Sequence, residues 1–193
     1  MTESTASPSL TGRTVAFLAT DGVEQAELTD PRTALEEAGA TTVLISLTHG
    51  EIQAYESDVN PADTFAVDAV VADASIDDYD ALVLPGGTTN PDALRTDADA
   101  VAFVRDFVGS GRPVGVICHG PWTLVEADVV RGRTLTSYPS VRTDIRNAGG
   151  TVVDEEVVVD GNLISSRNPD DLPAFGKALV TAVAEADTRP TSA

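Results

Sequence analysis

Residues 112–121 read Arg-Pro-Val-Gly-Val-Ile-Cys-His-Gly-Pro, and they indicate how the chain folds. The apolar run 114–117 lies between Gly and Pro residues, which is typical of a strand buried on both faces of a parallel sheet. Pro121 suits the first turn of a following helix. Cys118 is therefore predicted to lie on a sharp strand-to-helix turn, a nucleophile elbow, at the carboxyl edge of the sheet.

Cys118 is the only cysteine in the chain, and two interpretations of it compete. A lone cysteine is often a small buried apolar residue. Here, however, His119 follows it directly and Gly120 permits a close backbone approach. The N-terminus of the next helix favours a thiolate. These neighbours favour a cysteine nucleophile.

The 193 residues suit one domain with a substantial core, and 42% of them are hydrophobic. We place this domain at residues 13–187. It lies between an N-terminal tail, 1–12, that we expect to be disordered and a C-terminal tail, 188–193. The start of the chain lacks the basic and apolar segments of a signal peptide, and a lone cysteine fits a reducing compartment. We expect a cytoplasmic protein.

The chain is strongly acidic, with 31 acidic and 12 basic residues and a formal net charge of −19. Nucleic acid and anionic membranes are unsuitable partners, because each requires a basic face. The acidic residues are spread along the chain, which indicates a solvated acidic surface rather than an acidic tail. Concentrated salt screens the self-repulsion of such a surface, so we expect the cytoplasm of an extreme halophile.

The rest of the chain alternates between strand and helix patterns. We predict strands over 13–19, 41–47 and 79–84, and helices over 24–38, 98–108 and 172–186, with Pro31 kinking or restarting the first helix. Residues 48–74 suggest a short hairpin-like excursion. Segments 134–137, 141–147, 152–159 and 163–166 give further strands around one helix. Repeated β-α units predict an α/β fold with a mostly parallel central sheet and helices on both faces.

Three loops are expected to converge at the carboxyl edge of this sheet. Glu24 follows the first strand, Gly86 and Gly87 follow the third, and Cys118 and His119 follow the fourth. The amides of Gly87 and His119 would form an oxyanion hole opposite a Cys118 thiolate, the device that acyl transfer requires.

Five separated motifs, in this order, resemble the ThiJ/PfpI superfamily, and within it the PfpI-type intracellular cysteine protease and general-stress branch. They are Leu84-Pro-Gly-Gly87, Ile117-Cys-His-Gly-Pro121, Gly132-Arg-Thr-Leu-Thr-Ser-Tyr-Pro139, Asn147-Ala-Gly149 and Val157-Val-Val-Asp-Gly-Asn-Leu-Ile-Ser-Ser-Arg167. The resemblance implies a flavodoxin-like three-layer sandwich related to class I glutamine amidotransferases.

The resemblance also implies roles for individual residues. Cys118 is the nucleophile, and the family glutamate that shares a proton with its sulfur maps to Glu24. His119 is oriented by an acidic residue of a neighbouring subunit, at the position of Asp92. The resemblance therefore implies a homo-oligomer whose subunits share the active site.

Three activities remain open from the sequence. The first is a cysteine-dependent hydrolase that cleaves peptides through an acyl-enzyme. The second is a cofactor-independent glyoxalase or protein deglycase, in which Cys118 adds to a methylglyoxal-type aldehyde and Glu24 or His119 moves a proton. The third is a non-enzymatic stress protein that responds to reversible oxidation of Cys118.

We expect no metal and no cofactor. The two histidines, His49 and His119, lie seventy residues apart in a chain with a single cysteine, which is a weak set of metal ligands. The Gly86-Gly87 turn lacks the lysine and hydroxyl residue of a nucleotide-binding P-loop.

The acidic composition generates a first prediction about stability. At 1 M salt the Debye length falls to about 3 Å, so repulsion between surface carboxylates is largely screened. We expect the thermal unfolding midpoint, followed by circular dichroism, to rise steeply as KCl is raised from dilute buffer to molar concentrations. A midpoint already at its maximum in dilute buffer would contradict this prediction.

Overall fold

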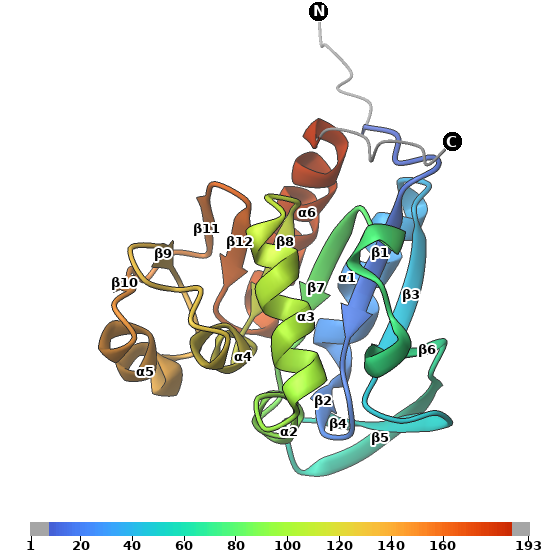
Figure 1. Cartoon of the computed structure of the whole chain (residues 1–193), viewed down its shortest axis with the longest axis horizontal. Coiled ribbons are helices and arrows are strands. Elements are labelled where there is room, and N and C mark those ends of the chain that lie inside the picture. Colours follow the sequence, from blue (N-terminus) through green and yellow to red (C-terminus); the bar gives the residue numbers. More distant parts are fainter. Residues whose placement is uncertain (1–7, 187–193) are drawn as a thin grey trace, which may run out of the picture.

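The computed structural model describes residues 8–186, and a seven-stranded sheet lies at its centre between two groups of helices (Figure 1). All neighbouring strands are parallel except the last pair, β11 and β12. The predicted α/β fold with a mostly parallel sheet is confirmed. In spatial order the strands are β11 (Val157–Asp160), β12 (Leu163–Ser166), β8 (Val114–Ile117), β7 (Ala81–Leu84), β1 (Thr14–Leu18), β3 (Thr41–Ser46) and β6 (Ala69–Val70).

The central strands are continuous apolar runs because helices cover both of their faces. Every residue of β7 and β8 is buried. At Gly115, in β8, a Cβ atom would lie 2.4 Å from Cδ2 of Leu179. The absent side chain thus lets a helix pack directly against the strand that leads to Cys118.

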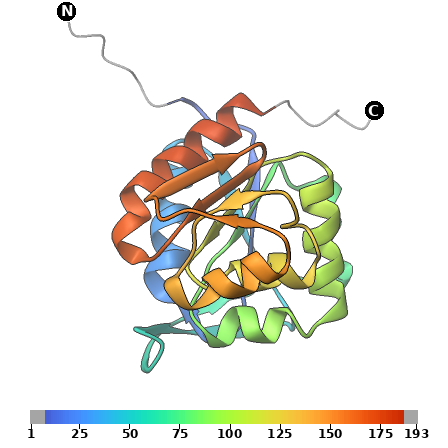
Figure 2. The same ribbon diagram turned by 90° about the vertical axis from the view of Figure 1, so that its left-hand side faces the viewer.

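Two helices, α1 (Gln25–Glu37) and α6 (Leu172–Glu185), cover one face of the sheet. The other face carries α2 (Thr89–Leu94), α3 (Ala98–Gly109), α4 (Pro121–Glu126) and α5 (Arg142–Asn147). Figure 2 shows the β11 edge of the sheet with α6 on one side and α3 on the other. The predicted restart of the first helix is wrong, since α1 runs without interruption through Pro31.

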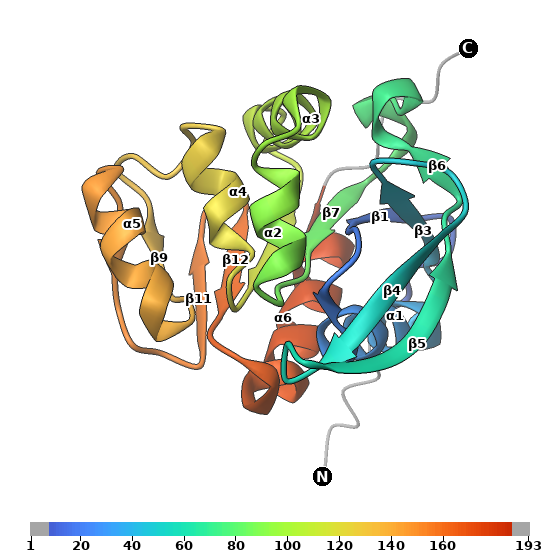
Figure 3. The ribbon, with the colours of Figure 1, turned by 90° about the horizontal axis from the view of Figure 1, so that it is seen from below.

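The hairpin-like excursion predicted between the second and third long strands is present. It consists of β4 (Glu51–Glu56) and β5 (Asn60–Ala66), which pair in antiparallel fashion, and β2 (Val23–Glu24) joins them. Seen from below, this hairpin crosses the end of the molecule beside α1 (Figure 3). Its tight turn, Ser57-Asp58, has positive φ angles of 55° and 63°.

The segment between β8 and β12 holds a small parallel pair, β9 (Thr134–Leu135) and β10 (Thr151–Val152). The segment 141–147, given among the further strands, is instead helical and forms α5. Single 3-10 turns complete the fold at η1 (Val71–Asp73), η2 (Ile76–Asp78), η3 (Pro139–Val141) and η4 (Pro169–Asp171).

The N-terminal boundary lies earlier than the sequence predicted. Leu10 is fully buried, and its amide donates to the carbonyl of Ala38 at 2.7 Å. The predicted boundary of the N-terminal tail at residue 12 is therefore wrong, because Leu10 already packs in the core beside α1. Residues 1–7 and the predicted tail 188–193 lie outside the described residues. Within 8–186, no helix has the length and apolar character needed to cross a bilayer.

Candidate active site

Cys118 occupies a strained position on the turn between β8 and α4. Its φ angle is +61°, which a non-glycine residue rarely adopts and which is common at functional sites. At Gly120, a Cβ atom would lie 2.7 Å from the carbonyl oxygen of Leu84, so only glycine lets the elbow pack against the end of β7. The predicted strand-cysteine-helix elbow is confirmed. The thiol is 6% exposed at its apex.

Glu27, in the first turn of α1, is the carboxyl group beside Cys118. It is fully buried, and its Oε2 accepts a hydrogen bond of 2.8 Å from the amide of Gly86. The side chains of Glu27 and Cys118 interact by hydrogen bonding. A Cβ atom on Gly86 would lie 2.6 Å from Glu27 Oε2 and 2.7 Å from Cys118 Cβ. A glycine at this turn is therefore required for the two groups to meet.

Glu27 is protonated at neutral pH. Burial raises the pKa of Glu27 to about 8, against the opposing hydrogen bonds from Cys118 and Gly86. Burial and the negative charge of ionised Glu27 raise the pKa of Cys118. Below pH 8 the carboxyl is mostly protonated, so this repulsion disappears. A protonated Glu27 is thus a partner that does not oppose a negative charge on the sulfur.

Two backbone amides also point to the sulfur. The amides of His119 and Gly87 form hydrogen bonds with Cys118 that lower the pKa of its thiol. Both residues were predicted from the sequence to form an oxyanion hole, and the structure brings their amides to the reactive atom. Their role toward a substrate oxyanion stays a prediction.

His119 connects the cysteine to a loop on the far side of the site. Its Nδ1 lies 3.1 Å from Cys118 Sγ and its Nε2 lies 3.0 Å from Ser140 Oγ. The Tyr138 ring stacks on the imidazole at a centroid distance of 4.4 Å. Burial lowers the pKa of His119, which keeps the imidazole neutral near pH 7 and able to accept a proton.

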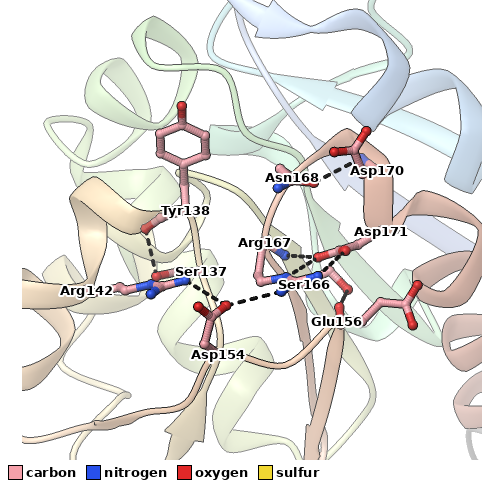
Figure 4. A network of polar contacts seen from close by, with 10 residues as sticks. All are labelled: Ser137, Tyr138, Arg142, Asp154, Glu156, Ser166, Arg167, Asn168, Asp170 and Asp171. Atoms are coloured by element: carbon pink, nitrogen blue, oxygen red, sulfur yellow. Dashed lines mark hydrogen bonds and ion pairs between the residues drawn. The ribbon is translucent and has the colours of Figure 1, made fainter.

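A network of ion pairs fixes the loops that carry Tyr138 and Ser140 (Figure 4). Asp154 pairs with Arg142 at 2.9 Å and with Arg167 at 3.1 Å. Arg167 in turn pairs with Asp171 at 2.8 Å, and Asp171 is 2% exposed. The network joins the loop before α5 to the loop after β12.

In the structure Glu24 is not the glutamate that contacts the Cys118 sulfur, the role that the resemblance implied for it. Its carboxylate accepts hydrogen bonds from the amides of Ser57 at 3.1 Å and Asp58 at 3.3 Å. It lines the pocket, but Glu27, three residues further along, is the glutamate beside the sulfur. Asp92 is exposed on α2, and its side chain forms no hydrogen bond or ion pair with any residue in 8–186.

A cavity of about 250 Å³ opens onto the thiol. Its walls are formed by Glu24, Glu27, Ser57, Asp58, Gly87, Cys118, His119, Tyr138 and Pro169. The sequence did not point to Glu27, Asp58, Tyr138 or Ser140. For Glu27 a signal existed, because it shares the buried face of α1 with Leu28, Pro31 and Leu35. An acidic residue among core positions of a helix indicates a functional carboxyl.

The fold and site together define an α/β protein with a buried cysteine on a nucleophile elbow, paired with a glutamate from the first helix. A family model described as the DJ-1/PfpI family matches residues 13–182, and the chain belongs to this family.

Two relatives are similar over most of their length. The chain is 42% identical to the Escherichia coli protein named "Protein/nucleic acid deglycase 2", over 84% of this chain and 93% of that one. It is 41% identical to the Bacillus subtilis protein named "Putative cysteine protease YraA", over 84% of this chain and 94% of that one. Among solved structures, Drosophila melanogaster DJ-1beta superposes with a TM-score of 0.79 at 29% identity, covering 89% of this chain and 90% of that chain.

The raised pKa of Glu27 generates a prediction about stability and pH. The folded protein holds this proton up to about pH 8, whereas the unfolded chain releases it near 4.5. Between these values the folded state binds more protons, so Glu27 makes stability fall as pH rises. We expect Glu27→Gln to remove this contribution. The difference in free energy of unfolding, variant minus wild type, should therefore increase from pH 5 to pH 8 by on the order of a few kcal/mol.

The measurement is chemical denaturation at a series of pH values in fixed KCl. Glu37→Gln, which removes an exposed carboxylate from the same helix, is the matched control and should follow the wild type. If the stability of Glu27→Gln also runs parallel to that of the wild type, the carboxyl is ionised throughout and a protonated Glu27 is ruled out.

Proposed function

We propose that the protein is a cysteine-dependent enzyme that acts on small carbonyl compounds, with Cys118 as nucleophile. The observation that carries this proposal is the environment of the sulfur. A protonated Glu27, two backbone amides and a neutral His119 surround the thiol within one small cavity. This arrangement supplies a nucleophile, proton carriers and oxyanion donors in one place.

The first chemical step uses these groups in order. His119 Nδ1 takes the thiol proton as the Cys118 sulfur forms a bond to the carbonyl carbon. The C=O π pair moves to oxygen, where the amides of Gly87 and His119 stabilise it. Glu27 then gives its proton to this oxygen, which leaves a neutral hemithioacetal and a Glu27 carboxylate. For a 2-oxoaldehyde, that carboxylate removes the proton from the hemithioacetal carbon. Reprotonation of the enediol at the neighbouring carbon gives a thioester, which water hydrolyses to a hydroxy acid.

The size of the cavity favours a small aldehyde or a glycated group over a folded peptide segment. Its volume of about 250 Å³ lies below the range of about 300–1,000 Å³ typical of pockets for drug-sized ligands. The thiol at its base is 6% exposed. Similarity to the E. coli protein named a deglycase supports the same assignment.

Peptide hydrolysis is the second candidate function. The same amides that would stabilise a hemithioacetal oxygen suit the tetrahedral intermediate of acyl transfer, and His119 is placed to protonate a leaving amine. Similarity to YraA supports this activity. The low exposure of Cys118 disfavours the third alternative, a redox sensor, because such cysteines are usually accessible.

Variants at the sulfur and at the two glutamates test the proposed reaction. With methylglyoxal as substrate, we expect Cys118→Ser to abolish turnover and Glu27→Gln to lower kcat by on the order of a hundredfold or more, since proton transfer contributes about that much. Glu24→Gln should act mainly on KM through the turn it holds. The readout is loss of dicarbonyl with formation of hydroxy acid. Thr143→Ala, on the exposed surface of α5, is the control.

Full turnover by Cys118→Ser would overturn the proposal. If the wild type cleaves peptides and turns over no aldehyde, peptide hydrolysis becomes the assigned function in place of carbonyl chemistry.

We also propose a homo-oligomer in which Asp92 contributes to a neighbouring subunit's site. Asp92 is exposed on the helix that directly follows the Gly86-Gly87 turn, and it has no side-chain partner within residues 8–186. Its free carboxylate is thus available to another chain, where it would act on His119 or Ser140.

Light scattering in 2 M KCl tests the assembly, and Asp92→Asn tests the shared site. We expect a dimer or larger, and a changed pH profile of kcat in the variant with the assembly intact. Asp99→Asn, an exposed acidic residue in the first turn of α3, is the control. A fully active monomer would remove this part of the mechanism.

A further inference from the structure

The turn between β4 and β5 forms a fixed wall of the active-site cavity. Both of its residues, Ser57 and Asp58, lie in the left-handed region. Their amides donate to the two carboxylate oxygens of Glu24. The Asp58 Oδ1 accepts a hydrogen bond of 2.7 Å from the amide of Thr88. Three hydrogen bonds therefore hold this turn at the cavity, and one of them is accepted by the Asp58 carboxylate itself.

The charges that face this cavity are all negative. Its walls contain the carboxyl groups of Glu24, Glu27 and Asp58 and no lysine or arginine. Both oxygens of Glu24 already accept hydrogen bonds from the turn, and Glu27 carries the proton of the catalytic pair near neutral pH. Asp58 is different, since its Oδ2 accepts no hydrogen bond from the described residues. Its charge is available to a ligand.

Two arginines of the loops that carry Tyr138 and Pro169 do not compensate this charge. Arg142 and Arg167 are held by Asp154 and Asp171 in the neighbouring loops (Figure 4). Neither of them lines the cavity. A ligand in the cavity therefore meets two carboxylates without a counter-ion among the described residues, Glu24 and Asp58, and of these only Asp58 has an oxygen that accepts no hydrogen bond. Independently of this charge, Oε1 of Glu27 is buried without a partner among the described residues, so the same cavity leaves a polar group for a ligand to satisfy.

We propose that Asp58 selects substrates by charge, so that the site prefers carbonyl compounds with an amine or guanidinium group near the reacting carbonyl and discriminates against carboxylates. The inference rests on the proposed function, because it concerns the same nucleophile and cavity. It adds a substrate class to that function. Both proposed reactions form a carboxylate product, and the same charge would favour its release.

Thiol-specific reagents test the preference without requiring turnover. Methanethiosulfonates react with a thiolate to form a mixed disulfide and release methanesulfinate, and Cys118 is the only thiol in the chain. The cationic ethyltrimethylammonium and anionic ethylsulfonate reagents are close in size, and the methyl reagent is neutral. The rate of each reagent with Cys118 is followed by mass spectrometry. It is divided by the rate of the same reagent with 2-mercaptoethanol, which removes differences in intrinsic reactivity among the reagents.

The rates are measured in 1 M KCl, where the field of the acidic surface is largely screened and a charge within the cavity is screened less. We expect the cationic reagent to react on the order of tenfold faster than the anionic one, from carboxylates at close range. Asp58→Asn should reduce this ratio at least threefold. Each charged rate is also divided by the neutral rate of the same variant, so that a change in the reactivity of the thiol cancels. Asparagine adopts the left-handed conformation and keeps the oxygen that accepts from Thr88.

Asp106→Asn, which removes one charge from the exposed side of α3, is the control and should keep the wild-type ratio. Asp58→Gly, which also tolerates a positive φ, replaces the asparagine variant if that one fails to fold. An unchanged ratio of the cationic to the anionic rate in the Asp58 variant would overturn the charge selection alone. No reaction of the folded wild type with the neutral reagent would overturn the proposed function and the selection with it.

Discussion

The contact between the Glu27 carboxyl and the Cys118 thiol across Gly86 is the constraint on which the site depends. Both groups are buried, and burial disfavours a charge on each of them. Burying these two polar side chains does not by itself stabilise the fold. Their meeting requires a glycine at 86, because a Cβ atom would lie closer to both side chains than packed atoms approach. The sequence of the Gly-Gly turn is thus explained by the chemistry beside it.

The parallel sheet makes this contact possible. The strands β1, β7 and β8 end at the same edge, so the first turn of α1, the Gly-Gly turn and the elbow converge there. Asn90, fully buried, ties these loops together. Its side chain donates to the carbonyls of Pro85 and Gly86 and accepts from the amide of Thr20. The site is therefore held by hydrogen bonds between one side chain and three loop backbone groups, which the motion of any one loop would disturb.

The sequence predicted the elements whose cause is local. The buried strands, the elbow at Cys118 and the amides of Gly87 and His119 follow from short runs and from the edge at which parallel strands end. The glutamate was assigned to Glu24 because it lies closest after the first strand, whereas the helix places Glu27 on its buried face. The tail at Leu10, the contact with Ser140 and the turn at Asp58 depend on partners 21 to 34 residues away, and no local pattern specifies them.

The acidity of the chain and the neutrality of its reactive groups are compatible because the charges are kept apart. Within the site, burial keeps Glu27 protonated and His119 neutral near pH 7. Arg142 and Arg167 pair with acidic side chains of the loops rather than with a ligand. These two arginines thus fix loops beside the cavity, and the carboxylates of Glu24 and Asp58 in its walls are left to face the substrate.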